Sequence, residues 1–459
     1  MLKKKMNEWW FAFYEIFNLK DEEAKGRTIT LTSNILVGLY NIFITGIFYT
    51  GFLTMYGMSI TDTGIITFIP LIANLFGVFS NKILGRFKRQ KRVLLTAKMT
   101  YYLIYIIATT LMPLVVIDPQ ARMICFSVLV FLANAIYAPF LPGITAWMYH
   151  FYPEDNERRA RYLVLLSMIS SVFSSLLMLF SSMLTDMLQG SAYQNQLILT
   201  LRYAAFVLVL IEILVQSRAK EYPSQENPNL KFREVFTLSF KYPKFMACMA
   251  FLFAWSFAGN LGGGVWSYHM LNHLNFSYTT INIVNVLYTP VLLLLSPVWQ
   301  KILGRLSWMR TLGLAILLVV PTEYAFFMMH PGNGWMYIPL CMIQHIMYVG
   351  ISLAMGNVLY MNLPAENPTT HIVFNTIGGN IFALMGMATG TWISSWTGDE
   401  TIYLFGMDMY SIQFTALLKG AMMTVMGAAA LWRWRAFTSD KDIAEIEQKE
   451  RMRKKCQQP

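Results

Sequence analysis

Two opposite charges, Glu323 and Lys419, lie inside long apolar segments in the second half of the chain. A charged side chain is costly in an apolar environment, so it normally faces a water-filled cavity or pairs with another charge. The carboxylate could bind and release a proton beside the ammonium, and the ammonium could meet an anionic molecule. The alternative is a buried pair that neutralises itself and helps to specify packing. Lys98 and Glu212 form a similar couple in the first half, for which we expect a structural role.

His345 is a further titratable candidate, since it stands beside Gln344 inside an apolar segment. An imidazole titrates near neutral pH, so His345 could sense or carry a proton. It could equally be a hydrogen-bonded structural partner, and the sequence favours neither role. His269 and His273 are four residues apart and could ligate a metal at a helix end, although we expect them in a loop instead.

Amide, phenol and indole side chains are scattered through the same kind of segment. They offer hydrogen-bond donors and acceptors, and their aromatic faces can stack on ring-bearing molecules. Each could instead bond to a neighbouring helix, and we expect about half of the set to line a cavity. The candidate binding residues are Asn41, Tyr49, Asn134, Tyr137, Asn260, Trp266, Tyr268, Gln344, His345 and Tyr348.

The elements that carry these residues follow from composition. The 459 residues are 56% hydrophobic and only 13% charged, whereas soluble domains carry roughly 25% charge. This excludes a soluble enzyme and a disordered protein. Segments of about 20 apolar residues cross the hydrocarbon of a bilayer as helices. We predict an all-α membrane protein with spans near 29–56, 60–84, 93–117, 121–149, 162–188, 197–216, 245–268, 278–300, 309–330, 334–357, 371–397 and 409–433.

The net charge of +11 is distributed unevenly along the chain. Basic residues concentrate in alternate loops and the C-terminal tail, as is typical of the cytoplasmic side of a membrane protein. We therefore expect no nucleic acid partner, a plasma (inner) membrane location and both termini in the cytoplasm. The expected parts are a cytosolic amphipathic segment (1–28), two six-helix bundles (29–216 and 245–433), a cytosolic linker (217–244) and a charged tail (434–459).

Motifs for cofactors and metals are absent from the sequence. There is no glycine-rich phosphate loop ending in Lys-Ser or Lys-Thr, and no His-Glu-x-x-His zinc motif. The four cysteines have neither disulfide-framework nor zinc-site spacing. We expect no cofactor, no metal and no enzymatic activity.

An internal repeat relates the two halves. Lys82-Ile-Leu-Gly-Arg86 recurs identically as Lys301-Ile-Leu-Gly-Arg305, at an offset of 219 residues, and Asn41 maps onto Asn260 at the same offset. The segment 13–19 also echoes 232–238. Because each half contains an even number of spans, the halves should have parallel orientation in the membrane.

With this duplication, the chain resembles the major facilitator superfamily. The loop after the second span, which contains Gly77, Asn81, Lys82, Gly85 and Arg86, is similar to the gating loop of that family. It departs from the family pattern in having Asn81 in place of an acid and one extra residue before Gly85. The resemblance implies transport of a solute by two bundles that rock around a midplane cavity, which the first, fourth, seventh and tenth helices line.

The expected function is therefore secondary transport, by alternating access, of a small polar organic solute. Sugar-like compounds are slightly favoured over amphiphilic drugs, which an efflux transporter would carry, and a lipid-handling protein on the same scaffold is a further alternative. Coupling to protons or another cation, as in a symporter, through His345 or Glu323 is a hypothesis. The other expected partners are membrane lipids, and we expect a monomer.

Overall fold

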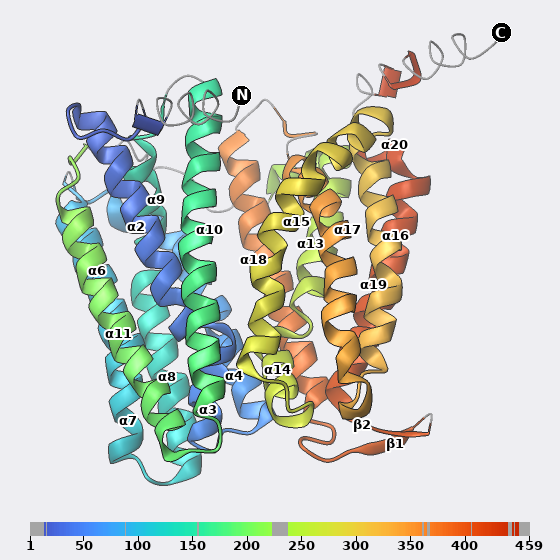
Figure 1. The fold of residues 1–459 in the computed structure, drawn as a ribbon. Coiled ribbons are helices and arrows are strands. Elements are labelled where there is room, and N and C mark those ends of the chain that lie inside the picture. The colour runs from blue at the N-terminus through green and yellow to red at the C-terminus, as the bar shows by residue number, and fades with distance from the viewer. Residues whose placement is uncertain are drawn as a thin grey trace, which may run out of the picture. The chain divides into compact units, whose positions relative to one another are not determined.

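The computed structural model describes residues 13–14, 16–87, 89–153, 156–222, 237–359, 362–364, 368–404, 406–438, 443–444 and 446–448. These residues are almost entirely helical (Figure 1), and eleven of their helices are long and apolar enough to cross a membrane. A twelfth span results if Tyr278–Leu292 and Leu294–Leu303, which meet at 48°, are counted together. The prediction of an all-α membrane protein with about twelve spans is confirmed.

The described residues group into two compact units. Unit 1 lies within Met1–Met58, Ile72–Pro228 and Ser277–Val286, and unit 2 within Ser59–Leu71, Asn229–Phe276 and Leu287–Pro459. Two helices are divided between the units by this grouping, namely α4 (Ile60–Asn74) and α15 (Tyr278–Arg305).

The remaining elements belong to one unit each. Unit 1 contains α2 (Glu22–Ile44), α3 (Gly46–Met55), η1 (Leu75–Phe79), α5 (Ser80–Leu84), α6 (Lys91–Tyr102), η2 (Leu103–Ala108), α7 (Thr109–Val115), α8 (Pro119–Tyr137), α9 (Leu141–Tyr149), α10 (Asn156–Met187) and α11 (Ala192–Ser217). Unit 2 contains η3 (Ser239–Lys241), α13 (Pro243–Asn260), α14 (Gly263–Tyr268), η4 (His269–His273), α16 (Trp308–Phe327), η5 (Pro331–Met336), α17 (Tyr337–Val358), α18 (Pro368–Ser394), β1 (Ile402–Leu404), β2 (Met407–Met409), η6 (Ser411–Gln413), α19 (Phe414–Trp432) and α20 (Trp434–Phe437).

Several predicted spans are interrupted. The stretch 121–149 is not one helix, because α8 ends at Tyr137 and α9 begins at Leu141. Pro139 and Pro142 explain the break, since proline lacks the N–H that continues a helix. The first span breaks at Thr45, where Gly46 adopts a φ of 57°. The bend in α15 lies between Pro290 and Pro297.

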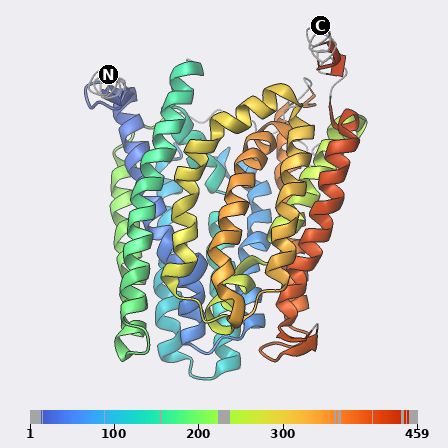
Figure 2. The same ribbon diagram turned by 45° about the vertical axis from the view of Figure 1, so that its right-hand side comes forward.

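Unit 2 is held together by helices that pack along their length. Figures 1 and 2 show the β1–β2 hairpin at the end of this unit opposite α20. Helices α16 and α19 approach closely because Gly313 leaves no side chain between them. A Cβ at this position would lie 2.6 Å from the backbone nitrogen of Leu431 and 2.7 Å from the carbonyl oxygen of Gly427. Small residues of this kind allow tight helix contacts in membranes.

The two copies of the repeated pentapeptide occupy similar places. Lys82–Arg86 covers the end of α5 and the turn after it, while Lys301–Arg305 ends α15. Most of the second copy of the other repeat, residues 232–236, lies outside the described residues.

Candidate functional site

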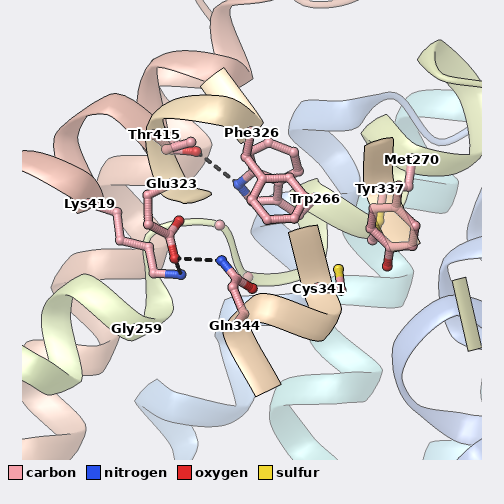
Figure 3. Close-up of a pocket in the computed structure, with 13 residues that line it drawn as sticks. Gly259, Trp266, Met270, Glu323, Phe326, Tyr337, Cys341, Gln344, Thr415 and Lys419 are labelled. Carbon is pink, nitrogen blue, oxygen red and sulfur yellow. Dashed lines mark hydrogen bonds and ion pairs between the residues drawn. The ribbon is translucent and has the colours of Figure 1, made fainter. Parts of the chain in front are cut away.

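Unit 2 contains a cavity of about 300 Å³. We call it the ion-pair pocket because Glu323 and Lys419 lie in its wall (Figure 3). Four helical segments build it, namely α13 to η4, α16, α17 and α19. Its lining residues are Gly259, Gly262, Gly263, Trp266, Met270, Glu323, Phe326, Tyr337, Cys341, Gln344, Thr415, Ala416 and Lys419.

The two charges form a direct ion pair. Lys419 Nζ lies 2.7 Å from Glu323 Oε1, and Gln344 Nε2 donates a hydrogen bond of 3.1 Å to the same oxygen. The Tyr348 hydroxyl interacts with the Lys419 ammonium. The Glu323 side chain is only 4% exposed, whereas that of Lys419 is 24% exposed. The Glu323 carboxylate is therefore buried, whereas part of the Lys419 side chain is exposed at the wall of the pocket.

The pair lies nearer to the helix ends than the predicted spans imply. A span of 309–330 would put Glu323 seven residues from its helix end, but α16 already ends at Phe327. Gln413 explains this end, since its Nε2 donates to the carbonyl oxygens of Phe327 and Met329. At 1.5 Å per residue, Glu323 is about 6 Å from the end of α16, and Lys419 is about 8 Å from the start of α19.

Trp266 forms a further part of the wall. The helix breaks after Asn260, Gly263 has a φ of 44°, and α14 then presents the indole. Trp266 Nε1 donates to Thr415 Oγ1 over 2.9 Å, and the ring lies edge-on to Phe326 with centroids 6.3 Å apart. Gly262 and Gly263 add no side chain and so leave room in the pocket. The wall thus combines charges, an amide and aromatic faces.

The structure separates the second-half candidates into two groups. Trp266 and Gln344 line the pocket, and Tyr348 interacts with Lys419 behind it. His345 turns toward α15, where its ring lies 5.0 Å from that of Tyr288. The remaining two point elsewhere: Asn260 Nδ2 donates to Ser256 O of its own helix, and Tyr268 packs against Ile60, Val265 and Ile412.

The first-half candidates lie in unit 1. Tyr137 stacks on Tyr101 with centroids 4.8 Å apart, and Tyr49 lies 5.9 Å from Tyr105. Asn134 Nδ2 donates to Val130 O in its own helix. Asn41 is half-buried in α2, and its carbonyl oxygen accepts from the Thr45 backbone and hydroxyl. Tyr49 and Tyr137 thus belong to one aromatic cluster with Tyr101 and Tyr105.

Arg202 was not among the sequence candidates, although it is fully buried in α11. Its guanidinium donates to Thr109 Oγ1, Thr110 Oγ1 and the Tyr105 carbonyl, and it lies 3.9 Å from the centroid of the Phe52 ring. A charged residue inside the predicted apolar span 197–216 was the sequence feature that could have identified it.

The remaining pocket residues follow a helical stripe that the sequence contains. Tyr337, Cys341, Gln344 and Tyr348 recur at intervals of three or four residues, so they share one face of α17. Thr415 stands four residues before Lys419 on α19 for the same reason. Periodicity of the polar and aromatic residues, rather than their types alone, could have identified this face and placed His345 off it.

The predicted gating loop forms a tight turn. After α5, the backbone N–H groups of Arg86 and Phe87 donate to the carbonyls of Ile83 and Leu84. Lys82, Gly85 and Arg86 are exposed, Gly77 lies in η1, and Asn81 lies within α5.

The structure corrects the expectation that the histidine pair lies in a loop. His269 and His273 both belong to the short π-helix η4 and are buried. Among the described residues, no group of three or more His, Cys, Asp or Glu side chains could hold a metal ion.

Comparison with known proteins agrees with this architecture. The Major Facilitator Superfamily model matches residues 31–371, so the chain belongs to this family of membrane transporters. No curated protein sequence matches it.

Solved structures share the fold at low sequence identity. The nucleoside transporter NupG is 13% identical with a TM-score of 0.61, covering 92% of this chain and 100% of its own. A bacterial homolog of the human lysosomal transporter Spinster, inward-facing and unoccupied, is 14% identical with a TM-score of 0.62, covering 92% and 98%. The D-xylose-proton symporter is 11% identical with a TM-score of 0.61, covering 92% and 99%.

Proposed function

We propose that the chain is a secondary transporter that moves a small polar organic solute by alternating access, and that the ion-pair pocket is part of its solute site. The observation that carries this proposal is the Glu323–Lys419 pair with Gln344 on the wall of a cavity of about 300 Å³. That volume is at the lower end of the range for small-molecule sites. Family membership supplies the transport context.

The lining favours a polar, ring-bearing solute such as a sugar or nucleoside. The Gln344 amide and the Lys419 ammonium can bind hydroxyl groups, while the faces of Trp266 and Phe326 suit a ring. Two of the similar structures, the nucleoside transporter and the D-xylose-proton symporter, are named for solutes with sugar rings. A neutral amphiphilic drug would leave the ion pair unused.

Glu323 is the proposed coupling group. Protonation of its carboxylate removes the charge that holds Lys419, so the ammonium becomes available to a solute. Deprotonation restores the pair and displaces the solute contact. His345 is a weaker coupling candidate because its ring faces Tyr288 rather than the pocket.

The charge distribution supports a membrane orientation with both termini in the cytoplasm of a plasma (inner) membrane. Within this proposal, 29–216 and 245–433 are the two six-helix bundles, 217–244 links them, and the turn around Lys82–Arg86 is a cytoplasmic gating element. The transporter is proposed to act as a monomer.

Uptake by proteoliposomes tests the function. We expect accumulation of radiolabelled uridine or D-xylose to depend on an inward proton gradient in the unmodified protein. Glu323→Gln should abolish accumulation while solute exchange continues. Uptake that is independent of both the pH gradient and the membrane potential would contradict proton coupling. Binding of only lipids or amphiphilic drugs would contradict the proposed class of solute.

A further inference from the structure

A chain of three titratable side chains runs through one end of unit 2. His273 Nε2 lies 2.9 Å from Asp399 Oδ1, and His273 Nδ1 lies 3.0 Å from Nδ1 of His269. The histidines are one turn apart in η4, and Asp399 lies between α18 and β1. Both distances are those of hydrogen bonds, so the three groups form a continuous path for a proton.

The exposure of these side chains falls along the path. The Asp399 side chain is 51% exposed, that of His273 is 5% exposed, and His269 is completely buried. Nε2 of His269 is buried without a hydrogen-bond partner among the described residues. An unpaired buried polar atom is destabilising. The inner end of the chain is therefore a vacant acceptor or donor position.

The inner end of the chain contacts a residue of the pocket wall. The His269 ring is edge-on to that of Trp266, with centroids 5.3 Å apart, and Trp266 and Met270 both line the ion-pair pocket. The path thus joins an exposed carboxylate to the pocket wall.

Other groups packed around the histidines complete their surroundings. The Tyr410 ring stacks on His273 at 3.7 Å and is edge-on to His269. From α14 the Tyr268 hydroxyl interacts with Asp399, and Asp62 of α4 faces Tyr268. Asp399 anchors the His273 ring through Nε2, while the stacked phenol ring holds the imidazole plane in place.

Hydrogen-bond chemistry fixes the protons in this chain. An ionised Asp399 accepts from Nε2–H of His273, which leaves Nδ1 of His273 as an acceptor. His269 must then carry its proton on Nδ1 and donate it to His273. Its Nε2 is unprotonated in this arrangement.

We propose that Asp399, His273 and His269 form a proton-conducting chain between the aqueous surface at this end of unit 2 and the ion-pair pocket. A proton that binds His269 Nε2 displaces the proton on Nδ1 to Nδ1 of His273, and the Nε2 proton of His273 passes to Asp399 and on to water. The rings then hold the opposite tautomers, from which the reverse transfer returns one proton to the pocket. This inference rests on the proposed proton-coupled transport, for which it supplies the route.

Nitrogen NMR of the full-length protein in lipid nanodiscs tests the chain without any solute. Six histidines give few enough ¹⁵N-imidazole signals to be assigned by single substitutions. At pH 8 we expect His269 protonated on Nδ1 and His273 on Nε2, and a ¹⁵N–¹⁵N coupling across the hydrogen bond. On acidification the two rings should change together at one pH, because a proton that binds at one end of the chain shifts the proton between the rings. Independent titration of the two rings, or no coupling at any pH, would overturn the chain.

Transport by the same variants separates the chain from the proposed function. His269→Gln should reduce gradient-driven uptake of uridine or D-xylose at least tenfold while exchange of the same compound continues. His330→Asn, in a turn of unit 2 outside the pocket, is the matched control and should behave as wild type. Gradient-driven uptake that survives His269→Gln would overturn the chain alone. Wild-type protein that transports neither compound would count against the proposed function, and the NMR spectra would still decide the chain.

Discussion

Two buried ion pairs, Lys98–Glu212 in unit 1 and Glu323–Lys419 in unit 2, join corresponding helices of the two halves. The first links α6 to α11 and the second links α16 to α19, which are the third and sixth spans of each half. The signs are exchanged between the halves. Each half therefore carries a charge pair on this helix couple, although Lys98 lies near the start of its span and Glu323 near the end of α16.

The surroundings of the pairs differ. Lys98 Nζ lies 2.5 Å from Glu212 Oε2, both side chains are at most 4% exposed, and Ser33 and Gln216 complete the hydrogen bonding. Lys419 is instead 24% exposed and faces a cavity with Glu323. We call Lys98–Glu212 the closed pair, because its hydrogen bonds are complete and it is buried, and Glu323–Lys419 the open pair, because it lines a cavity. A closed pair suits packing, whereas an open pair can exchange its partner for a solute. The contrast teaches that access to the pair, rather than its burial, is what marks a candidate site.

The largest expected effect on stability comes from removing one charge of the closed pair. Glu212→Gln leaves the Lys98 ammonium buried without a counter-charge, so we expect a loss of about 3–5 kcal/mol in the free energy of unfolding. Thermal denaturation in detergent, followed by size-exclusion chromatography, measures it. The double variant Lys98→Met/Glu212→Gln should recover most of the loss. A fully stable Glu212→Gln protein would remove the distinction between the pairs.

The matching change in the open pair should cost less. Glu323→Gln leaves Lys419 partly accessible to water in the pocket, so we expect a loss of roughly 1–2 kcal/mol in the same denaturation assay. Proton-driven accumulation should be lost in full. A loss of stability as large as that of Glu212→Gln would assign both pairs to packing.

A still smaller effect is expected at the pocket wall. Trp266→Phe keeps the aromatic face but removes the hydrogen bond to Thr415, which is worth about 0.6–1.7 kcal/mol in membrane proteins. The loss in the free energy of solute binding should exceed the loss in the free energy of unfolding. Binding measured by intrinsic fluorescence or calorimetry in the variant checks this, and an unchanged constant would exclude Trp266 from the site.

The smallest effect is expected for His345→Gln. The ring packs on Tyr288 outside the pocket, so we expect a change below about 0.5 kcal/mol in stability. Proton-driven uptake should match that of wild type. Loss of coupling in this variant would transfer the coupling role from Glu323 to His345.

Much of the fold could be predicted from the sequence. Long apolar segments, loop charges and the repeated motif are all visible in the residue order, so the spans and the repeat could be predicted. The interruptions were less so: the break between α8 and α9 follows from Pro139 and Pro142, but prolines are also tolerated inside membrane helices. The end of α16 depends on Gln413, which is distant in the chain.

Only part of the candidate site could be predicted from the sequence. Glu323 and Lys419 stand out because charges are rare in apolar segments, and Gln344 and Trp266 were recognised by their chemistry. Tyr337, Cys341 and Thr415 were missed because residue type does not reveal which face of a helix turns toward a cavity. The His273–Asp399 contact joins residues 126 positions apart, and no local pattern in the sequence indicates it.

Ligand-induced stabilisation tests the central claim, that the open pair belongs to a solute site and the closed pair does not. The purified protein would be screened thermally against sugars, nucleosides, amino acids, organic acids and cationic drugs. A ligand at a hundredfold excess over its dissociation constant adds about 2.7 kcal/mol to the stability of the folded state. We predict that a sugar or nucleoside stabilises wild type and Lys98→Met/Glu212→Gln but not the matching double variant Glu323→Gln/Lys419→Met, which lacks the ammonium that binds the solute. Equal stabilisation of all three proteins, or none of wild type by any class, would contradict the account.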